Sequence, residues 1–246
     1  MSNLLQKKTV ERTLASAAAF LAVTPILTYV LWLSDGCDPY LPFISDMDLP
    51  ERSGASFTVG YAISGILLAC SSLQFGILRE RWLIRNGVER SWVVLNRFSF
   101  ISSILSGISL FWISFTPWDE HLVLHIAQAN VIFIGSVAWA VCVSLVTSRM
   151  ADSDPSFSGL VRHRFALAAA GLIGLLGMGE RFVRFSGITM DMYALEERLT
   201  MLDQDCVSLN ETLLSQAAFF EWVLAASMVL MVASLVPEVR KIAEQE

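Results

Sequence analysis

Charged residues are scarce in this chain of 246 residues: Asp, Glu, Lys and Arg make up only 16% of it, whereas hydrophobic residues make up 54%. A water-soluble globular protein has about 25% charged residues, and the mean hydropathy here is +0.58, so that class is excluded. The high apolar content also excludes a disordered chain, and four cysteines are too few for a small disulfide scaffold. The composition is that of a membrane protein.

Six segments are long and apolar enough to cross a bilayer, which takes about 20 residues in a helix. The first is longer than the apolar core of a signal peptide, so we expect it to be retained. We predict an all-α, six-transmembrane helical bundle that forms a single domain over residues 1–246, with no separate soluble module. The expected spans are about 13–33, 55–78, 97–117, 122–148, 165–188 and 214–236.

Basic residues are unevenly divided between the two sides of this bundle. With the N-terminus inside, only Arg52 and Arg198 fall in outer loops, while the acidic residues gather there. By the positive-inside rule, both the N- and the C-terminus are therefore predicted to be cytoplasmic. Twelve basic residues fall on the cytoplasmic side: Lys7, Lys8, Arg12, Arg79, Arg81, Arg85, Arg90, Arg149, Arg162, Arg164, Arg240 and Lys241.

Two cysteines and one glycosylation sequon fall on the predicted outer side. Cys37 and Cys206 lie in the first and third outer loops, in an oxidising compartment, and either form a disulfide or remain free thiols. We expect the disulfide, because an exposed free thiol is uncommon there. The sequence Asn210-Glu211-Thr212 is an acceptor sequon close to the sixth span, and its position agrees with the predicted topology.

Five ionisable residues fall inside predicted spans, where charges are costly and usually face the bundle interior. By depth, all five lie in the outer half of the bilayer; Arg181 and Glu221 can pair across adjacent helices, and Glu180 and Arg184 can pair along one helix. They either line a polar pocket open to the lumen or outer leaflet, or join helices structurally. These candidates are His125, Glu180, Arg181, Arg184 and Glu221.

The sequence contains no signature of a metal centre or of a cofactor. His121 and His125 are four residues apart, but neither an HExxH motif nor a cysteine pair accompanies them, so no metal and no cofactor is expected. The glycines between Gly171 and Gly179 are spaced for close packing of two helices rather than for phosphate binding. No catalytic residue can be assigned from the sequence.

Several short motifs of the chain form a familiar pattern. The first outer loop reads Pro39-Tyr40-Leu41-Pro42-Phe43-Ile44-Ser45-Asp46 and then Pro50-Glu51-Arg52-Ser53, and the fourth span contains His125 with Phe133 and Trp139. This pattern resembles that of the Frag1/DRAM/Sfk1 superfamily, and the resemblance extends over essentially the whole chain. The residues that carry it as family-motif positions are Pro42, Ser45, Asp46, Pro50, Glu51, Asn96 and Trp222, the last preceded by Glu221.

The resemblance implies one of three roles, because the branches of the superfamily differ. Ser45-Asp46 and Pro50-Glu51-Arg52-Ser53 are similar to the DRAM branch, whose members promote autophagy in lysosomal and endosomal membranes. Cys37 and Cys206 are similar to the GPI-remodelling branch, although Ser64-Gly65-Ile66 departs from that branch's motif. The third branch, similar to Sfk1, affects phosphoinositides and lipid asymmetry at the plasma membrane.

We therefore expect a multi-pass endomembrane protein that is a non-enzymatic modulator of lysosomal or autophagic membrane function. The alternatives are a GPI-anchor lipid-remodelling factor of the Golgi or endoplasmic reticulum, which as an enzyme would transfer acyl groups, and a plasma-membrane regulator similar to Sfk1. In the remodelling alternative His125, Arg181 and Glu221 line a headgroup pocket on the luminal side. The expected partners are membrane lipids and a further membrane protein, with no nucleic acid.

Overall fold

A computed structural model describes residues 5–37, 39–187, 195 and 211–243, and all regular structure within these residues is helical. Six helical segments are long and apolar enough to cross a membrane. The elements in chain order are α1 (Lys7–Ser34), η2 (Ile44–Asp48), α2 (Glu51–Arg85), α3 (Arg90–Ile113), α4 (Trp118–Ser153), η3 (Pro155–Phe157), α5 (Ser158–Ser186), α7 (Thr212–Ala233) and α8 (Leu235–Ala243).

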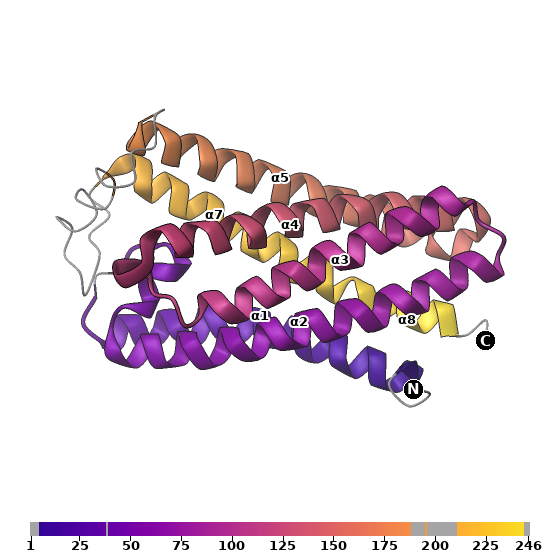
Figure 1. Ribbon diagram of the computed structural model, residues 1–246, viewed down its shortest axis with the longest axis horizontal. Helices are drawn as coiled ribbons and strands as arrows, with labels where there is room; N and C mark the ends of the chain where they lie inside the picture. Colours follow the sequence, from indigo (N-terminus) through magenta and orange to yellow (C-terminus); the bar gives the residue numbers. More distant parts are fainter. Residues whose placement is uncertain (1–4, 38, 188–194, 196–210, 244–246) are drawn as a thin grey trace.

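The long helices run side by side along one axis, and the two chain ends lie together at one end of the bundle (Figure 1). The α2–α3 connection and η3 lie at this end too, which we call the termini end. The short helix η2 and the α3–α4 connection lie at the opposite end, which we call the cap end. This arrangement agrees with six crossings; which end faces the cytoplasm stays a prediction from the charge distribution.

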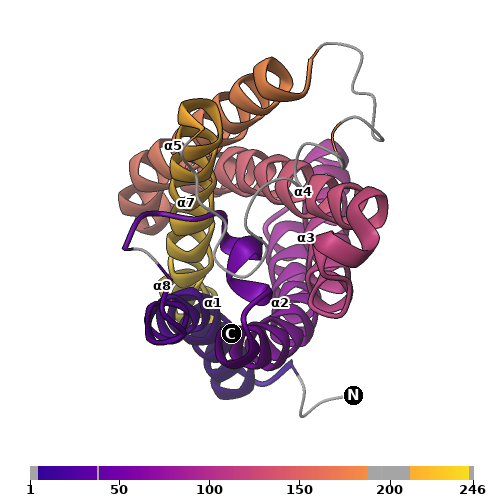
Figure 2. The same ribbon diagram turned by 90° about the vertical axis from the view of Figure 1, so that its left-hand side faces the viewer.

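The helices form a closed ring. Each of α1 to α4 packs against the next, α4 packs against α5, α5 against α7, and α7 returns to α1. Figure 2, which looks onto the cap end, shows η2 in the middle of this ring of helix ends. Large apolar side chains such as Ile26, Ile173 and Leu176 are exposed on the flank of the bundle, as a hydrocarbon environment requires.

Glycines allow α5 to approach α7 closely. A Cβ atom added to Gly174 would lie 2.9 Å from the backbone nitrogen of Leu224 and from the carbonyl oxygen of Phe220, and Cβ atoms at Gly171 and Gly177 would also collide with α7 side chains. The glycine run was predicted to serve close helix packing, and these three positions do so. Gly179, the last of the run, has nothing within 4 Å and takes no part.

The predicted sixth span, 214–236, is broken in the structure. The helix α7 ends at Ala233, and α8 starts at Leu235 after Ser234. Pro237 explains this break, because its ring has no N–H to donate and collides with the carbonyl of the residue four positions earlier, which is Ala233. The short helix α8 then packs against α1 and α2 at the termini end.

Candidate functional site

Residues 42–48, which we call the cap segment, are tied to α7 by two hydrogen bonds. The indole Nε1 of Trp222 donates to the carbonyl oxygen of Pro42 at 2.8 Å, and the backbone nitrogen of Ile44 donates to Glu221 Oε2 at 2.7 Å. Within the cap segment, the backbone nitrogen of Phe43 donates to Asp46 Oδ2 at 3.0 Å and closes the first turn of η2. Adjacent residues of one transmembrane helix thus fix the conformation of a loop.

Aromatic rings support the cap segment from α1. Trp32 is fully buried; it stacks on Tyr29 with a centroid separation of 5.8 Å and meets Tyr40 edge-on at 5.2 Å. Tyr29 also meets Trp222 edge-on at 6.3 Å, and its hydroxyl donates to the carbonyl oxygen of Tyr40 at 3.1 Å. Tyr40 precedes the cap segment by two residues, and η2 itself contacts α1, α2 and α7, so the cap segment is held between these helices.

Beneath the cap segment lies a cavity of about 710 Å³ inside the ring of helices. Its walls are mostly apolar and come from all six long helices, with Leu68, Phe133 and Trp139 among the residues that line it. The carboxyl and imidazole groups that line it belong to Asp46, Glu221 and His125, Tyr61 contributes a phenol, and no Lys or Arg of the described residues lines it. The cavity thus has an acidic end under the cap segment and a long apolar remainder.

His125 is held in a defined orientation at the acidic end of the cavity. Its Nδ1 lies 2.7 Å from the carbonyl oxygen of Thr116, in the α3–α4 connection. A carbonyl oxygen only accepts hydrogen bonds, so Nδ1 carries the proton, and Nε2 of the neutral ring is an acceptor. The side chain of Thr116 in turn donates to Gln128 Oε1 at 2.6 Å, which fixes the connection to α4.

Two acidic residues of the cap segment have strongly altered acidity. Burial raises the pKa of Asp46 to about 7, and the hydrogen bond from the Phe43 backbone offsets only part of that rise. Burial also raises the pKa of Asp48 to about 7, with a further contribution from the negative charge of Asp119. Both carboxyl groups therefore change their protonation near neutral pH.

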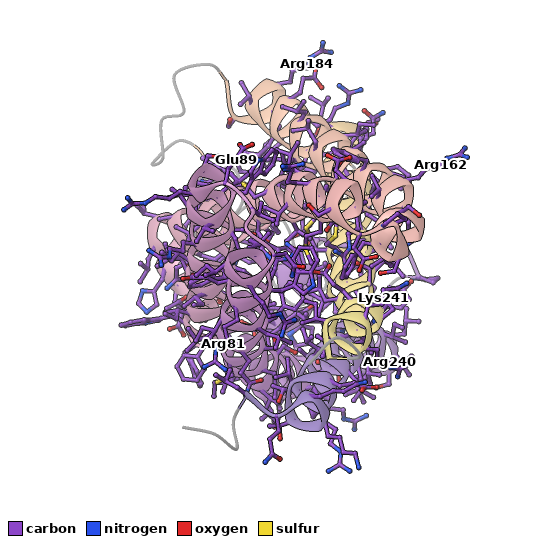
Figure 3. All side chains as sticks on the ribbon, turned by 90° about the vertical axis from the view of Figure 1, so that its right-hand side faces the viewer. Arg81, Glu89, Arg162, Arg184, Arg240 and Lys241 are labelled. Atoms are coloured by element: carbon purple, nitrogen blue, oxygen red, sulfur yellow. The ribbon has the colours of Figure 1, made fainter. Side chains whose placement is uncertain are left out.

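Of the five ionisable residues predicted inside the spans, the structure places His125 and Glu221 in the cavity wall and the other three outside it. Glu180 forms ion pairs with Arg181 and with Arg184 along α5. Figure 3 shows Arg184 pointing away from the bundle, in agreement with its exposed side chain. These three charges therefore belong to the surface of α5.

Arg181 and Glu221 were expected to be able to pair because they lie at similar depth, and this expectation is wrong. Arg181 Nε donates to Gln216 Oε1 at 2.6 Å, on the neighbouring helix. The carboxylate of Glu221 is instead occupied by the backbone nitrogen of Ile44, in a loop that depth along the helices could not place. A backbone N–H thus satisfies the buried acid in place of a basic side chain.

The family-motif positions divide into two groups. Ser45, Asp46 and Trp222 line the cavity, and Pro42 receives the hydrogen bond from Trp222. The others serve helix ends and helix packing: Pro50 precedes the first residue of α2, Glu51 is exposed in its first turn, and Asn96 Nδ2 donates to the carbonyl oxygen of Gly76 at 2.9 Å between α3 and α2.

The disulfide and the sequon can be compared with the structure only in part. Cys37 is disulfide-bonded and buried beside Trp32 and Met47. Cys206 and Asn210 lie outside the described residues, so the pairing of Cys37 with Cys206 and the glycosylation of Asn210 stay predictions.

Among the described residues, no group of three or more His, Cys, Asp or Glu side chains could hold a metal ion.

A second charged site, at the termini end, was missed by the sequence analysis. Arg79, Arg164 and Glu238 are fully buried, although the two arginines had been assigned to the cytoplasmic side as flanking charges. Arg79 donates hydrogen bonds to both carboxylate oxygens of Glu238, at 2.7 and 2.8 Å, and Arg164 forms an ion pair with the same carboxylate. The exposed Arg162, two residues from Arg164, points outward in Figure 3. Two arginines that are two residues apart in sequence thus lie in different environments: Arg164 is buried in the bundle and Arg162 is exposed.

This cluster joins four helices and the α7–α8 junction. Thr147 of α4 accepts from Arg79 Nη2 at 2.7 Å and from Arg164, while Arg164 Nη2 donates to the carbonyl oxygen of Ser234 at 2.6 Å. The spacing of α8 contained a signal for it: Leu235, Val239 and Ile242 form a buried stripe, and Glu238 falls within that stripe. The cluster connects the helices at the termini end, and none of its residues lines the cavity.

Comparisons with known proteins agree with the motifs. The model of the family described as Frag1/DRAM/Sfk1/Cwh43P N-terminal domain matches residues 12–242, nearly the whole chain. No curated protein and no solved structure matches the chain.

Proposed function

The chain belongs to the Frag1/DRAM/Sfk1/Cwh43P N-terminal domain family, and from this premise and its cavity we propose that it binds a membrane lipid beneath the cap segment. The observation that carries the proposal is the cavity of about 710 Å³ with apolar walls and a polar end. Pockets for small molecules span about 300–1,000 Å³ and combine apolar walls with few polar groups. This division of the cavity suits an amphiphile, with its hydrocarbon part along the helices and its head under the cap segment.

A lateral opening supports access from the bilayer. Ile26 of α1 and Leu230 of α7 both line the cavity, and they are 62% and 51% exposed. Side chains so exposed reach the flank of the bundle, and we infer that the cavity opens to the hydrocarbon region where α1 meets α7. A lipid enters sideways by this route without carrying its chain through water.

The position of the family motifs supports the same site. Ser45, Asp46 and Trp222, from opposite parts of the chain, meet at the polar end of the cavity. Because the cap segment is tied to α7 by Trp222 and Glu221, it presents these polar groups in a fixed arrangement. The proposed role is therefore binding and handling of lipid, with the cap segment as the headgroup wall.

We place this role in lysosomal or endosomal membranes, on the likeness of Ser45-Asp46 and Pro50-Glu51 to the DRAM branch. Co-sedimentation of the tagged protein with acid hydrolases is expected, and confinement to the Golgi or the plasma membrane would remove this placement. The cysteine at position 37 supports GPI-anchor remodelling as the alternative. In that case, loss of the protein alters the amount or lipid composition of surface GPI-anchored proteins.

Filling the cavity tests lipid binding directly. Ala225 lines the cavity, whereas Ala127 is exposed on α4 and does not line it. The purified Ala225→Phe variant is expected to lose most of the lipid that co-purifies with the protein, and Ala127→Phe is expected to retain it. Gel filtration confirms that both variants are folded. Equal lipid in both variants would show that the lipid binds elsewhere.

A further inference from the structure

The side chains lining the cavity that carry a full charge when ionised near neutral pH, Asp46 and Glu221, are both acidic. Asp46 and Glu221 are 5% exposed each, close enough to interact electrostatically, and no basic residue of the described chain lines the cavity with them. Arg181 and Arg184 of α5 are paired with Glu180 on the outside of that helix, and Arg52, six residues after Asp46, pairs with Asp35. None of the described residues in the wall offers a counter-charge to a phosphate or a carboxylate.

Both carboxyl groups retain an oxygen for a ligand. Glu221 Oε2 accepts from Ile44 and Asp46 Oδ2 accepts from Phe43. Glu221 Oε1 makes no hydrogen bond with the described residues, and the carboxyl group of Asp46, which also interacts with Trp118, keeps lone pairs for a further donor. The neutral ring of His125 contributes Nε2 as a third acceptor, because Nδ1 donates to Thr116. The cavity wall thus offers three acceptors on three separate elements.

Trp118 adds an N–H beside one of these acceptors. It is 7% exposed, lines the same cavity, and its buried indole interacts with the carboxyl group of Asp46. An N–H directed at a carboxyl group favours the charged carboxylate, which is the form that attracts a cation.

We infer that the polar end of the cavity receives the protonated amine of a single-chain lipid. An ammonium group has three N–H donors and no acceptor, which matches the three acceptors of Asp46, Glu221 and His125. A phosphate or carboxylate head would instead bring like charges together in a region of low dielectric constant, which disfavours its binding. The assignment rests on the proposed lipid-binding function and names the chemical class of the ligand's head.

The size of the cavity sets the number of chains. A volume of about 710 Å³ lies within the range that accommodates a drug-sized molecule. One hydrocarbon chain with a small head is of that size, whereas a two-chain phospholipid is considerably larger. A second chain would have to lie outside the cavity, so the volume favours a single-chain lipid as the occupant.

The test compares four probes that share a C18 chain: octadecylamine, octadecanol, stearic acid and octadecyl phosphate. The full-length protein in detergent is exposed to an equimolar mixture at neutral pH, and native mass spectrometry measures the fraction bound of each probe. The amine is expected to exceed the phosphate by about tenfold or more, which corresponds to about 1.4 kcal/mol. Wild-type protein alone gives this ranking, so the result does not depend on how any variant folds.

Variants that remove one carboxylate charge test whether the preference for the amine probe arises in the cavity. Glu221→Gln keeps an oxygen that accepts the Ile44 hydrogen bond and removes the charge, so it is expected to abolish the preference for the amine without loss of the fold. Asp46→Asn is expected to act in the same direction. Glu120→Gln, an exposed residue of α4 outside the cavity wall, is the matched control and is expected to retain the full preference.

Each other outcome overturns a definite part of the account. If all four probes bind equally and Ala225→Phe displaces all of them, the lipid cavity stands and the amine assignment is wrong. A preference for stearic acid or for the phosphate also overturns the amine assignment. If no probe binds, or if Ala225→Phe has no effect on binding, the proposed lipid-binding function itself is wrong.

Discussion

The backbone nitrogen of Ile44 donates to the carboxylate of Glu221 at 2.7 Å, across 177 residues of sequence. This single bond gives a buried acid its partner and at the same time holds the cap segment over the cavity. Because Glu221 also lines the cavity, a change at this position affects the cap segment and any bound ligand together.

The loss of this bond is expected to weaken the cap end. Glu221→Ala leaves the Ile44 N–H without a partner, which costs about 1–3 kcal/mol of unfolding free energy. Glu221→Gln retains an acceptor and is expected to cost less. Thermal unfolding in detergent measures the difference between the two variants, and hydrogen exchange of the Ile44 amide locates it. Equal losses in both variants would mean that the hydrogen bond is not what stabilises this end.

The charged cluster at the termini end is expected to be the more sensitive site. Glu238→Ala leaves two arginines buried without their shared carboxylate, which costs about 3–5 kcal/mol. The control is Glu11→Gln, which breaks the exposed ion pair with Arg240 and is expected to cost at most about 1 kcal/mol. Urea unfolding of both variants provides the comparison. A small effect of Glu238→Ala would show that the cluster is not a structural lock.

Asp46 is expected to make stability depend on pH. Its pKa is about 7 in the folded protein against 3.8 in the unfolded chain, so between these values the folded state binds more protons. The unfolding free energy therefore falls as pH rises from about 4 to 7, by at most about 1.4 kcal/mol per pH unit for this group.

Asp48 contributes in the same direction, with Asp119 as its charged neighbour, while Glu221 and His125 face Asp46 from α7 and α4. Asp46→Asn is expected to flatten the profile of melting temperature against pH between 4 and 7. A profile that rises with pH over this range, or one that Asp46→Asn does not change, would contradict the assignment.

The partner of Cys37 is expected to be Cys206. Peptide mapping without reduction should yield one linked pair of peptides that contains both residues and disappears after reduction. Cys70, which is free and exposed, serves as the internal control that an unpaired thiol is alkylated. Alkylation of Cys206 in the unreduced protein would rule out the pairing. A disulfide that closes a loop this long typically stabilises a protein by about 2–4 kcal/mol.

The architecture was largely predictable from the sequence, because hydropathy and length determine which segments can cross a membrane. The site was predictable only in part. His125 and Glu221 were marked by being ionisable within apolar spans, and both line the cavity. Their partners were not predictable, since Glu221 binds a backbone N–H of a loop and depth along a helix says nothing of where a loop folds.

The buried cluster was missed for a different reason. Arg79 and Arg164 lie within a few residues of apolar segments and resemble the flanking charges that determine topology. The helices in fact continue past them, α2 as far as Arg85, so both side chains point into the bundle instead of into water. A hydropathy window cannot distinguish a charge that ends a span from one that is buried by a helix extending beyond the span.

Photo-crosslinking tests the central claim, lipid binding within the ring of helices, most directly. A C18 lipid with a diazirine on its chain is activated in a bilayer that contains the full-length protein, and the labelled residues are mapped by mass spectrometry. The account predicts label on cavity-lining residues such as Phe133, Trp139 and Ala225, and its loss in Ala225→Phe. Label confined to outward-facing residues such as Ile173 and Leu176 would contradict it.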